Sequence, residues 1–357
     1  MTGRTIRVLV IDDSALVREL LTRILEQEPG IEVIGTAMDP IYAIKMIKSQ
    51  KPDVITLDLE MPRMDGLTFL RKLMSVYPLP VVVVSSLAKK GSKATLEALE
   101  LGALDFVTKP AAGLSKGLEE MGMEIVQKVN NAADVNVNKL RQQARKGRMS
   151  EKSPSSREDK PAQQVVVRRT DRVVAIGAST GGTVAVKEIL QQLSANTPGV
   201  IVVLHMPAGF TTSYAQSLNS SCRMKVKEAE DGDRISFGQA FIAPGGKHLL
   251  LEKKSSGYII RLDNGPPVNR HRPSVDKTFF SVAEESSPDS MGLILTGMGG
   301  DGARGLKAMH DQGSPTLAQD EETSIVYGMP RQAVELGAVD RILPLGEMAA
   351  AIQDFVT

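Results

Sequence analysis

The residues best suited to covalent chemistry lie in the segment VVAIGASTGGTVAV, residues 173–186. Gly177, Ser179 and Gly181 fit the spacing G-x-S-x-G, in which glycines permit a strained strand-to-helix turn that presents a serine nucleophile. The same turn would place backbone amides where they could bind phosphate. The segment fits neither a Walker loop nor a spaced G-x-G-x-x-G motif. This pattern alone fits two roles of the turn equally well: presenting Ser179 as a nucleophile, or binding phosphate through its amides.

A serine nucleophile needs an imidazole to remove its proton and a carboxylate to orient that imidazole. The sequence contains four histidines. We favour His205 because it ends the apolar run VIVVLHMP, which would lie beside residues 173–177 in a parallel sheet. For His248, His271 and His310 we expect structural or surface roles, although His271 could contact an acidic partner.

The best carboxylate candidate is Asp301, which follows the apolar run in MGLILTGMGGDG. Glycines in this loop would let the backbone approach closely. Alternatively, Asp301 only caps a helix that starts at Ala303. Asp231, Asp233, Asp276 and Asp320 are rivals, but none follows so clear a strand.

Ser179, His205 and Asp301 thus form a candidate catalytic triad drawn from three strand ends. Backbone amides near Thr180 and Met298 would supply the oxyanion hole. The chain order Ser, His, Asp differs from the order in the common α/β-hydrolases. The ordinary lipase or esterase fold is therefore not expected.

A second group of polar residues lies in the first third of the chain, also at predicted strand ends. Asp12 and Asp13 end the first strand and Asp58 ends the third, while Ser85 and Lys109 follow the fourth and fifth. Three converging carboxylates would repel one another unless a cation neutralised them, and oxygen ligands suit Mg²⁺. Asp58 could then accept a phosphoryl group whose oxygens Lys109 and Ser85 would hold. Taken singly, Asp13 could be a helix cap and Lys109 an exposed lysine.

The elements that would position these residues alternate along the chain. Residues 7–11, 32–36, 53–59, 81–85 and 104–107 are predicted strands, and apolar residues recur at helical spacing between and after them. The predicted helical stripes are Leu16, Leu20 and Ile24; Leu67, Leu70 and Leu73; Leu96, Leu99 and Leu101; and Leu118, Met121, Ile125 and Val129. Five strand–helix pairs predict a parallel sheet covered on both faces, with its site at the carboxyl ends of the strands.

A change in composition separates this half from the next. The segment KLRQQARKGRMSEKSPSSREDKPAQQ is charged and nearly free of large apolar residues, which predicts a linker. A basic nucleic-acid-binding arm is the alternative, but acidic residues interrupt it. We therefore expect domains at residues 1–129 and 171–357, joined by a flexible linker at 130–170.

Composition argues against nucleic-acid binding, disulfide bonding and membrane insertion. The 357 residues include 43 Lys and Arg against 42 Asp and Glu, so no net field attracts nucleic acid or an anionic membrane. One cysteine, Cys222, cannot form an internal disulfide, and neither a signal peptide nor a membrane span is recognisable. We expect a cytoplasmic protein without membrane insertion or nucleic-acid binding.

The strings VLVIDDSALVR, DVITLDLEMPRMDG, VVVVSS and DFVTKP resemble the response-regulator receiver domain of two-component systems. The resemblance implies a flavodoxin-like (βα)5 domain that a histidine kinase phosphorylates on Asp58. It also implies Mg²⁺ at Asp12, Asp13 and Asp58. A switch would involve Ser85 and Phe106, the latter at the aromatic position that reorients on activation.

The second half resembles the chemotaxis response-regulator protein-glutamate methylesterase family. The resemblance rests on IGASTGG, VLHMP, IAPGGKHL, HRPSVD and LTGMGGDG, which occur in order. It implies a doubly wound α/β domain with an added antiparallel hairpin, supplied by residues 240–243, 248–251 and 258–262. It also implies hydrolysis of glutamate methyl esters on chemoreceptor cytoplasmic helices, with release of methanol, and deamidation of receptor glutamines. No cofactor is expected for hydrolysis.

The two-domain layout and the resemblance together suggest regulation. If the receiver domain covers the cleft that holds Ser179, phosphorylation of Asp58 need only weaken that interface by a few kcal/mol to shift the populations. The main alternative is a receiver-controlled binding domain that uses GASTGG to hold phosphate without hydrolysis. A DNA-binding regulator is a third hypothesis, disfavoured because the second half lacks a basic recognition helix.

Overall fold

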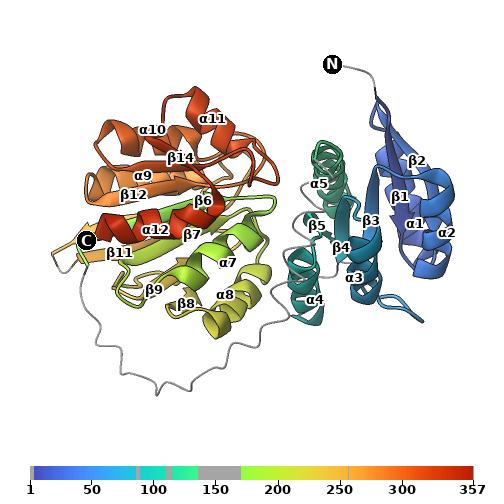
Figure 1. Cartoon of the computed structure of the whole chain (residues 1–357), viewed down its shortest axis with the longest axis horizontal. Helices are drawn as coiled ribbons and strands as arrows, with labels where there is room; N and C mark the ends of the chain where they lie inside the picture. The colour runs from blue at the N-terminus through green and yellow to red at the C-terminus, as the bar shows by residue number, and fades with distance from the viewer. Residues whose placement is uncertain (1–3, 86–88, 110–114, 136–169, 256, 357) are drawn as a thin grey trace. The chain divides into compact units, whose positions relative to one another are not determined.

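The computed structural model of the chain describes residues 4–85, 89–109, 115–135, 170–255 and 257–356. The chain divides into two compact units, Met1–Ser155 and Ser156–Thr357, which Figure 1 colours from blue to green and from green to red. Residues 136–169, most of the predicted linker, lie outside the described residues. Before them, a helix continues to Ala133, past residue 129 where the first domain was expected to end.

A five-stranded parallel sheet forms the centre of the first unit, in the order β2-β1-β3-β4-β5. Both β3 and β4 are buried along their whole length because helices cover both faces of the sheet, which explains their continuous apolar residues. The flavodoxin-like fold predicted for this unit is confirmed. The strands are β1 (Ile6–Ile11), β2 (Ile31–Ala37), β3 (Val54–Asp58), β4 (Val81–Ser85) and β5 (Asp105–Thr108).

A helix follows each strand of this sheet. The side chains of Ser14, Asp39 and Asp65 accept hydrogen bonds from first-turn amides and so fix where the first three helices begin. The helices are α1 (Ala15–Glu26), α2 (Pro40–Gln50), α3 (Gly66–Val76), α4 (Lys89–Glu100) and α5 (Ser115–Ala133).

The apolar stripe predicted in α1 is only partly buried. Leu20 and Ile24 are half-buried and Leu16 is 75% exposed, whereas the neighbouring Leu21 and Leu25 are fully buried. Apolar residues are adjacent at 20–21 and at 24–25, so two stripes with the same helical spacing are possible. Packing selects the second stripe, which the spacing alone could not distinguish.

A seven-stranded sheet forms the centre of the second unit, in the order β14-β13-β12-β6-β7-β9-β8, with every neighbouring pair parallel. Its strands are β6 (Val173–Ala178), β7 (Gly199–Leu204), β8 (Lys225–Glu228), β9 (Gln239–Ile242), β12 (Ser290–Ile294), β13 (Thr316–Gln319) and β14 (Arg341–Leu343). The three central strands β12, β6 and β7 are buried along their whole length.

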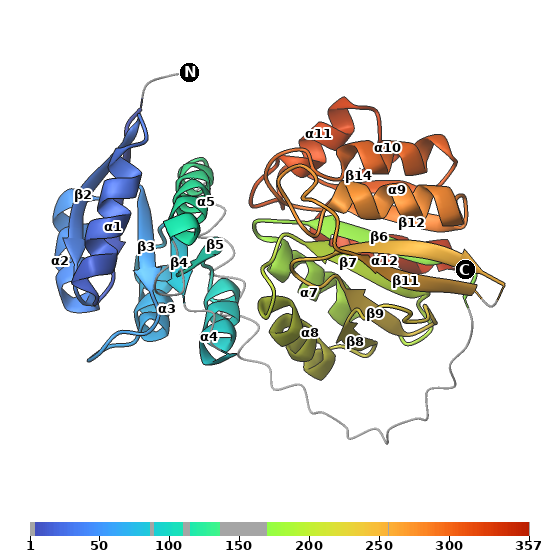
Figure 2. The same ribbon diagram turned by 180° about the vertical axis from the view of Figure 1, so that it is seen from behind.

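Helices cover both faces of this sheet, as Figure 2 shows. One face carries α7 (Gly182–Gln192), α8 (Phe210–Ser221) and α12 (Leu345–Val356), and the other carries α9 (Val275–Ser286), α10 (Ala303–Asp311) and α11 (Met329–Glu335). The doubly wound fold predicted for the second unit is confirmed.

The added antiparallel hairpin is also present, but it has two strands. It consists of β10 (His248–Lys254) and β11 (Gly257–Asp263), which pair from His248 opposite Asp263 to Lys254 opposite Gly257. Residues 240–243, predicted to belong to it, instead form most of β9 in the parallel sheet. Ala240, Phe241 and Ile242 are all buried, and only a central strand covered on both faces buries consecutive side chains in this way.

The strand order reverses beside β6. From β6 the chain adds β7 and, further out, β8 and β9 on one side, and then returns to add β12, β13 and β14 on the other. In open parallel sheets, ligands bind outside the carboxyl ends of the strands at such a reversal. The ends of β12, β6 and β7 therefore mark the expected position of a site.

Candidate active site

Ser179 lies in a tight turn between β6 and α7. Gly181 adopts φ +79°, a left-handed conformation that favours glycine, and caps the helix. A Cβ at Gly182 would lie 2.6 Å from the Cβ of Ala178, so the turn has no room for a larger residue there. The Ser179 amide donates to the Thr296 carbonyl at 3.0 Å. The serine is thus held at the carboxyl end of β6, as its G-x-S-x-G spacing predicted.

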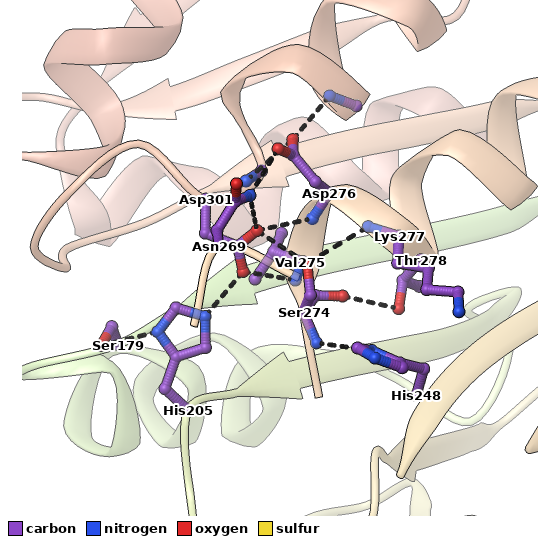
Figure 3. Close-up of polar contacts among 12 residues, drawn as sticks. Ser179, His205, His248, Asn269, Ser274, Val275, Asp276, Lys277, Thr278 and Asp301 are labelled. Atoms are coloured by element: carbon purple, nitrogen blue, oxygen red, sulfur yellow. Dashed lines mark hydrogen bonds and ion pairs between the residues drawn. The ribbon is translucent and has the colours of Figure 1, made fainter. Parts of the chain in front are cut away.

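His205 follows β7 directly, and its ring lies between Ser179 and Asp301 (Figure 3). Its Nδ1 is 3.1 Å from Ser179 Oγ, and its Nε2 is 2.8 Å from Asp301 Oδ2. A carboxylate can only accept a hydrogen bond, so a neutral His205 carries its proton on Nε2. Nδ1 is then free to accept the serine proton.

Asp301 follows β12 and lies at the N-terminus of α9, where unpaired amides and the helix dipole favour an anion. Its Oδ2 accepts from the Val275 amide at 2.7 Å as well as from His205. Its Oδ1 accepts from Ser274 Oγ at 2.7 Å and from the Asp276 amide at 3.2 Å. The carboxylate is 3% exposed, yet every oxygen has donors, which is how a buried charge is tolerated.

The surroundings of Asp301 keep it ionised. Burial by itself would raise the pKa of this carboxyl group, but the hydrogen bond and charge of His205 oppose it, with the hydrogen bonds of Asn269 and Ser274. The net effect is a pKa well below the ordinary value of 3.8. An ionised Asp301 can orient the imidazole and stabilise a cation there without taking up the proton itself.

The loop after β12 lies against the serine. A Cβ at Gly297 would be 2.8 Å from Ser179 Cβ and 2.9 Å from Ser179 N, so only glycine allows this approach. Thr296 Oγ1 also donates to the Thr180 carbonyl at 3.0 Å. The residues predicted to form the oxyanion hole, Thr180 and Met298, thus belong to two segments that are tied together beside Ser179.

Two residues near this group were not identified from the sequence. Asn269 donates its amide to Asp301 Oδ1 at 2.7 Å. The ring of His271, for which a structural or surface role was expected, is stacked on that of His205 with centroids 3.6 Å apart and an angle of 6° between the planes. Both lie in the loop before α9, and only the HRPSVD string pointed to this loop. Loop geometry of this kind leaves no periodic signal in a sequence.

Other histidines and aspartates considered for the site lie elsewhere or have structural contacts. His248 is fully buried, with Nε2 3.0 Å from the Pro266 carbonyl and Nδ1 accepting from the Ser274 amide at 3.2 Å. His310, on α10, lies near Asp311 and Asp340. Asp276 is buried and accepts from the amides at positions 302 and 305, so it holds the loop that carries Asp301.

The predicted acidic group of the first unit is assembled at one edge of its sheet. Carboxylate oxygens of Asp12, Asp13 and Asp58 lie within 4.8 Å of one another. Lys109 Nζ is 2.9 Å from Asp12 Oδ2 and 2.8 Å from Asp58 Oδ2. Burial raises the pKa of Asp12, and Lys109 only partly opposes this. Burial would lower the pKa of Lys109, but its hydrogen bonds and charge interactions with the two aspartates raise it.

Of the predicted switch residues, Ser85 ends β4 and Phe106 lies within β5. Ser85 is buried, and its hydroxyl accepts from Thr95 Oγ1 of α4 at 2.7 Å. Phe106 is 3% exposed, and the Nζ of Lys128 lies 5.1 Å from its ring centroid. Burial would lower the pKa of Lys128, but the charges of Asp105 and Glu124 raise it. The Phe106 side chain is therefore turned inward beneath a cation.

The donor set of the acidic group fits a divalent cation. Three carboxylates, two of them buried, supply only oxygen atoms, the ligand type that Mg²⁺ prefers. One lysine cannot neutralise three carboxylates, so the group retains negative charge. Among the described residues, this is the one cluster of three or more acidic, histidine or cysteine side chains close enough to share a metal ion.

Over the part of the chain that the structure describes, no helix is both long and apolar enough to cross a membrane.

Two family models match the sequence: the response regulator receiver domain over residues 8–121, and CheB methylesterase over residues 174–352. These ranges contain all the residues of the acidic group and of the serine site.

Curated relatives match the chain over nearly its whole length. A protein-glutamate methylesterase/protein-glutamine glutaminase of Geobacter metallireducens is 48% identical over 348 residues, covering 98% of this chain and 95% of the relative. One from Xanthomonas campestris is 50% identical and covers 96% and 99%. The crystal structure of the Thermotoga maritima CheB methylesterase catalytic domain is 38% identical, covers 52% of this chain and 98% of its own, and superposes with a TM-score of 0.51.

Proposed function

The chain belongs to the CheB methylesterase family and carries a response regulator receiver domain, and from that premise we propose how its residues act. It is a protein-glutamate methylesterase and protein-glutamine glutaminase. Its substrates are methyl-esterified glutamates and certain glutamines on the cytoplasmic helices of chemoreceptors. Ser179, His205 and Asp301 carry out the hydrolysis, and phosphorylation of Asp58 regulates it.

The first half of the reaction transfers the substrate acyl group to Ser179. His205 Nδ1 takes the proton of Ser179 Oγ as the oxygen attacks the γ-carbonyl carbon of the glutamyl ester. The carbonyl oxygen becomes an oxyanion, which the amides of Thr180 and Met298 stabilise. His205 then gives its proton to the methoxide oxygen, methanol leaves, and a glutamyl-serine ester remains. For a glutamine substrate the leaving group is ammonia.

The second half returns the serine. His205 takes a proton from water, whose oxygen attacks the glutamyl-serine ester, and the same proton passes to Ser179 Oγ as the ester bond breaks. The product is a glutamate carboxylate. Asp301 stays ionised throughout and accepts from Nε2, so the ring keeps Nδ1 toward the serine.

The observation that carries this proposal is the unbroken pair of hydrogen bonds from Ser179 Oγ to His205 Nδ1 and from His205 Nε2 to Asp301 Oδ2, at 3.1 and 2.8 Å. A loop that only bound phosphate would need backbone amides. It would not require a histidine hydrogen-bonded to both the serine and a buried carboxylate, which a serine nucleophile does require.

The acidic group of the first unit supports the regulatory part of the proposal. Asp58 accepts a phosphoryl group from a histidine kinase, and Asp12, Asp13 and Asp58 would hold Mg²⁺, which would neutralise charge on the transferring phosphoryl group. Lys109, 2.8 Å from Asp58, binds a phosphate oxygen after transfer. Ser85 and Phe106 change position in response. The chemistry requires no nucleic acid and no cofactor at the serine site.

The test is methanol release from a methylated chemoreceptor fragment. Ser179→Ala should lower the rate by a factor on the order of 10⁶, to what the oxyanion hole and binding alone provide. Ser220→Ala removes a serine from the exposed side of α8 and should leave the rate unchanged. Methanol release by Ser179→Ala at the wild-type rate would exclude the mechanism.

A further inference from the structure

A tight turn next to the serine site brings two side chains onto the proposed catalytic residues. Val268 and His271 each donate a backbone amide to the carbonyl of the other, at 3.0 and 2.9 Å. The two residues between them, Asn269 and Arg270, have φ values of +52° and +68°. This left-handed conformation at both positions is typical of a two-residue type I′ hairpin turn. The turn fixes which way the side chains on either side of it point.

The first of these side chains is that of Asn269, which lies between two buried carboxylates (Figure 3). Its Nδ2 donates to Asp301 Oδ1 at 2.7 Å and to Asp276 Oδ2 at 2.8 Å. Its Oδ1 accepts from Arg304 Nη2 at 3.2 Å. The amide uses both of its N–H groups, so it can adopt only one orientation.

The second side chain is that of His271, which covers one face of the His205 ring. The two rings are nearly parallel, 6° apart, and their centroids are separated by 3.6 Å. Hydrogen bonds at Nδ1 and Nε2 anchor His205 at two points of its ring. Each hydrogen bond tolerates some bending, so the two bonds oppose a small tilt of the ring plane only weakly. A ring stacked on the face of the imidazole opposes that tilt.

We propose that Asn269 and His271 are positioning residues of the serine site, Asn269 fixing the Asp301 carboxylate and His271 fixing the plane of the His205 imidazole. The proposal rests on the proposed function of Ser179, His205 and Asp301. The described contacts of Asn269 and His271 with these residues are to the Asp301 carboxylate and to the face of the His205 ring. They act on the geometry of the two residues that move the proton, and a displacement of about 1 Å in such groups costs on the order of 100-fold in rate.

The effect should appear in kcat and not in KM. Asn269 and His271 contact the triad, so substrate binding stays the same while proton transfer becomes slower. A second readout does not depend on the receptor at all. A fluorophosphonate probe reacts with an activated serine, and its rate of reaction with Ser179 reports the activation of that oxygen by His205.

Asn269→Gly tests the carboxylate contact. Glycine adopts φ +52° without strain, so this substitution removes the side chain and leaves the turn. Arg270→Gly is the matched control, because it makes the same change at the neighbouring left-handed position. Both residues are exposed, but the described hydrogen bonds to Asp276 and Asp301 come from Asn269. We expect Asn269→Gly to lower both kcat and the fluorophosphonate rate by a factor on the order of ten or more. Arg270→Gly should change neither by more than about twofold.

His271→Ala and His271→Phe test the stacking. Phenylalanine keeps a flat ring on the face of His205 but cannot titrate or donate a hydrogen bond, so His271→Phe should keep most of the kcat that His271→Ala loses. Equal losses in both variants would exclude stacking as the role of His271. Thermal unfolding of each variant identifies any that fail to fold.

The outcomes separate this inference from the proposed function. If Ser179→Ala is inactive while Asn269→Gly and His271→Ala match Arg270→Gly, the positioning role is wrong and the triad stands. If Ser179→Ala keeps full activity and reacts with the fluorophosphonate as fast as the wild type, the triad itself is wrong. A loss in Asn269→Gly that appears in KM alone would also overturn the positioning role.

Discussion

Asp301 has the largest number of described hydrogen bonds among the proposed catalytic residues. It accepts from His205, Asn269, Ser274, Val275 and Asp276. All of these groups donate to an ionised carboxylate. An amide in its place would direct an N–H group at the donors that face one of the two carboxylate oxygens. The carboxylate therefore contributes to the stability of the second unit as well as to its chemistry.

We expect Asp301→Asn to lower kcat by a factor on the order of 10⁴, because the imidazole loses the partner that sets its tautomer. It should also lower the free energy of unfolding at pH 7 by about 1.5–3 kcal/mol, the usual contribution of hydrogen bonds to a charged group. Asp311→Asn on α10 is the control, because that carboxyl group is at the surface and should contribute little.

The stability difference should depend on pH in one direction. The folded pKa of Asp301 lies below the ordinary 3.8, so the carboxylate stabilises the fold fully above pH 3.8. That contribution is lost as the pH falls through the folded pKa. Urea unfolding of wild type and Asp301→Asn should therefore differ at pH 7 and converge in strong acid. A difference that grew below pH 3.8 would contradict this assignment.

The residues that could be predicted from the sequence are those at strand ends. Ser179, His205 and Asp301 each follow a clear apolar run, and parallel strands bring their carboxyl ends to one edge. Asn269 and His271 follow no strand of the sheet. Their positions depend on two left-handed backbone conformations in a loop. Asparagine is favoured in that conformation, but Arg270 stands where a type I′ turn usually has glycine, so the usual turn signal is missing.

Among the elements of the second unit, the loop after β12 connects the two halves of the site. Gly297 lies against Ser179, and its carbonyl accepts from the amides of Gly328 and Met329 at 3.1 and 2.8 Å. Asp301 lies at the other end of the same loop. The loop therefore packs against Ser179, is hydrogen-bonded to the start of α11 and carries Asp301.

Gly297→Ala should disturb this loop. Its Cβ would lie 2.3 Å from Met329 Sδ and 2.8 Å from Ser179 Cβ, so the backbone must move. We expect a loss of about 1–3 kcal/mol in the free energy of unfolding, the usual cost of overpacking, and a lower kcat. Gly346→Ala in α12 is the control, because its Cβ would meet no atom within 4 Å. A fully active and stable Gly297→Ala would show that the approach is not needed.

Strands and helices with a clear pattern of apolar residues were predicted accurately. Features that depend on packing partners distant in the sequence were not. The strands of the first unit were found within a residue or so of their bounds, because each is a continuous apolar run. The helix α1 was predicted, but its most buried residues were not, because adjacent apolar residues allow two stripes. The place of β9 was wrong because a short apolar strand can belong to a hairpin or a parallel sheet, and only the tertiary partners decide.

At the scale of the whole molecule, the chain combines an acceptor of phosphoryl groups with a hydrolase. Both sites lie at the carboxyl edges of parallel sheets, where loops can change without disturbing the core. Asp58 is 3% exposed and paired with Lys109, so a phosphoryl group added there must rearrange the surrounding contacts. Such a rearrangement would be the physical basis of the proposed switch.

Methanol release should rise when a small phosphodonor such as acetyl phosphate is added with Mg²⁺. A shift of 1.4 kcal/mol between two states corresponds to a tenfold change in population, so we expect stimulation of about tenfold in the wild type. Asp58→Asn should show none, whereas Glu26→Gln, on the exposed side of α1, should respond as the wild type does. Equal stimulation of wild type and Asp58→Asn would rule out the switch.

The order in which the strands of the second unit occur along the chain has a consequence for biosynthesis. Ser179 and His205 are 26 residues apart, but Asp301 lies 96 residues beyond His205. A ribosome therefore completes the serine and the histidine long before it adds the strand that brings the aspartate, and β12 pairs directly with β6. A chain that ends before β12 would therefore lack both the strand that pairs with β6 and the carboxylate proposed to orient His205.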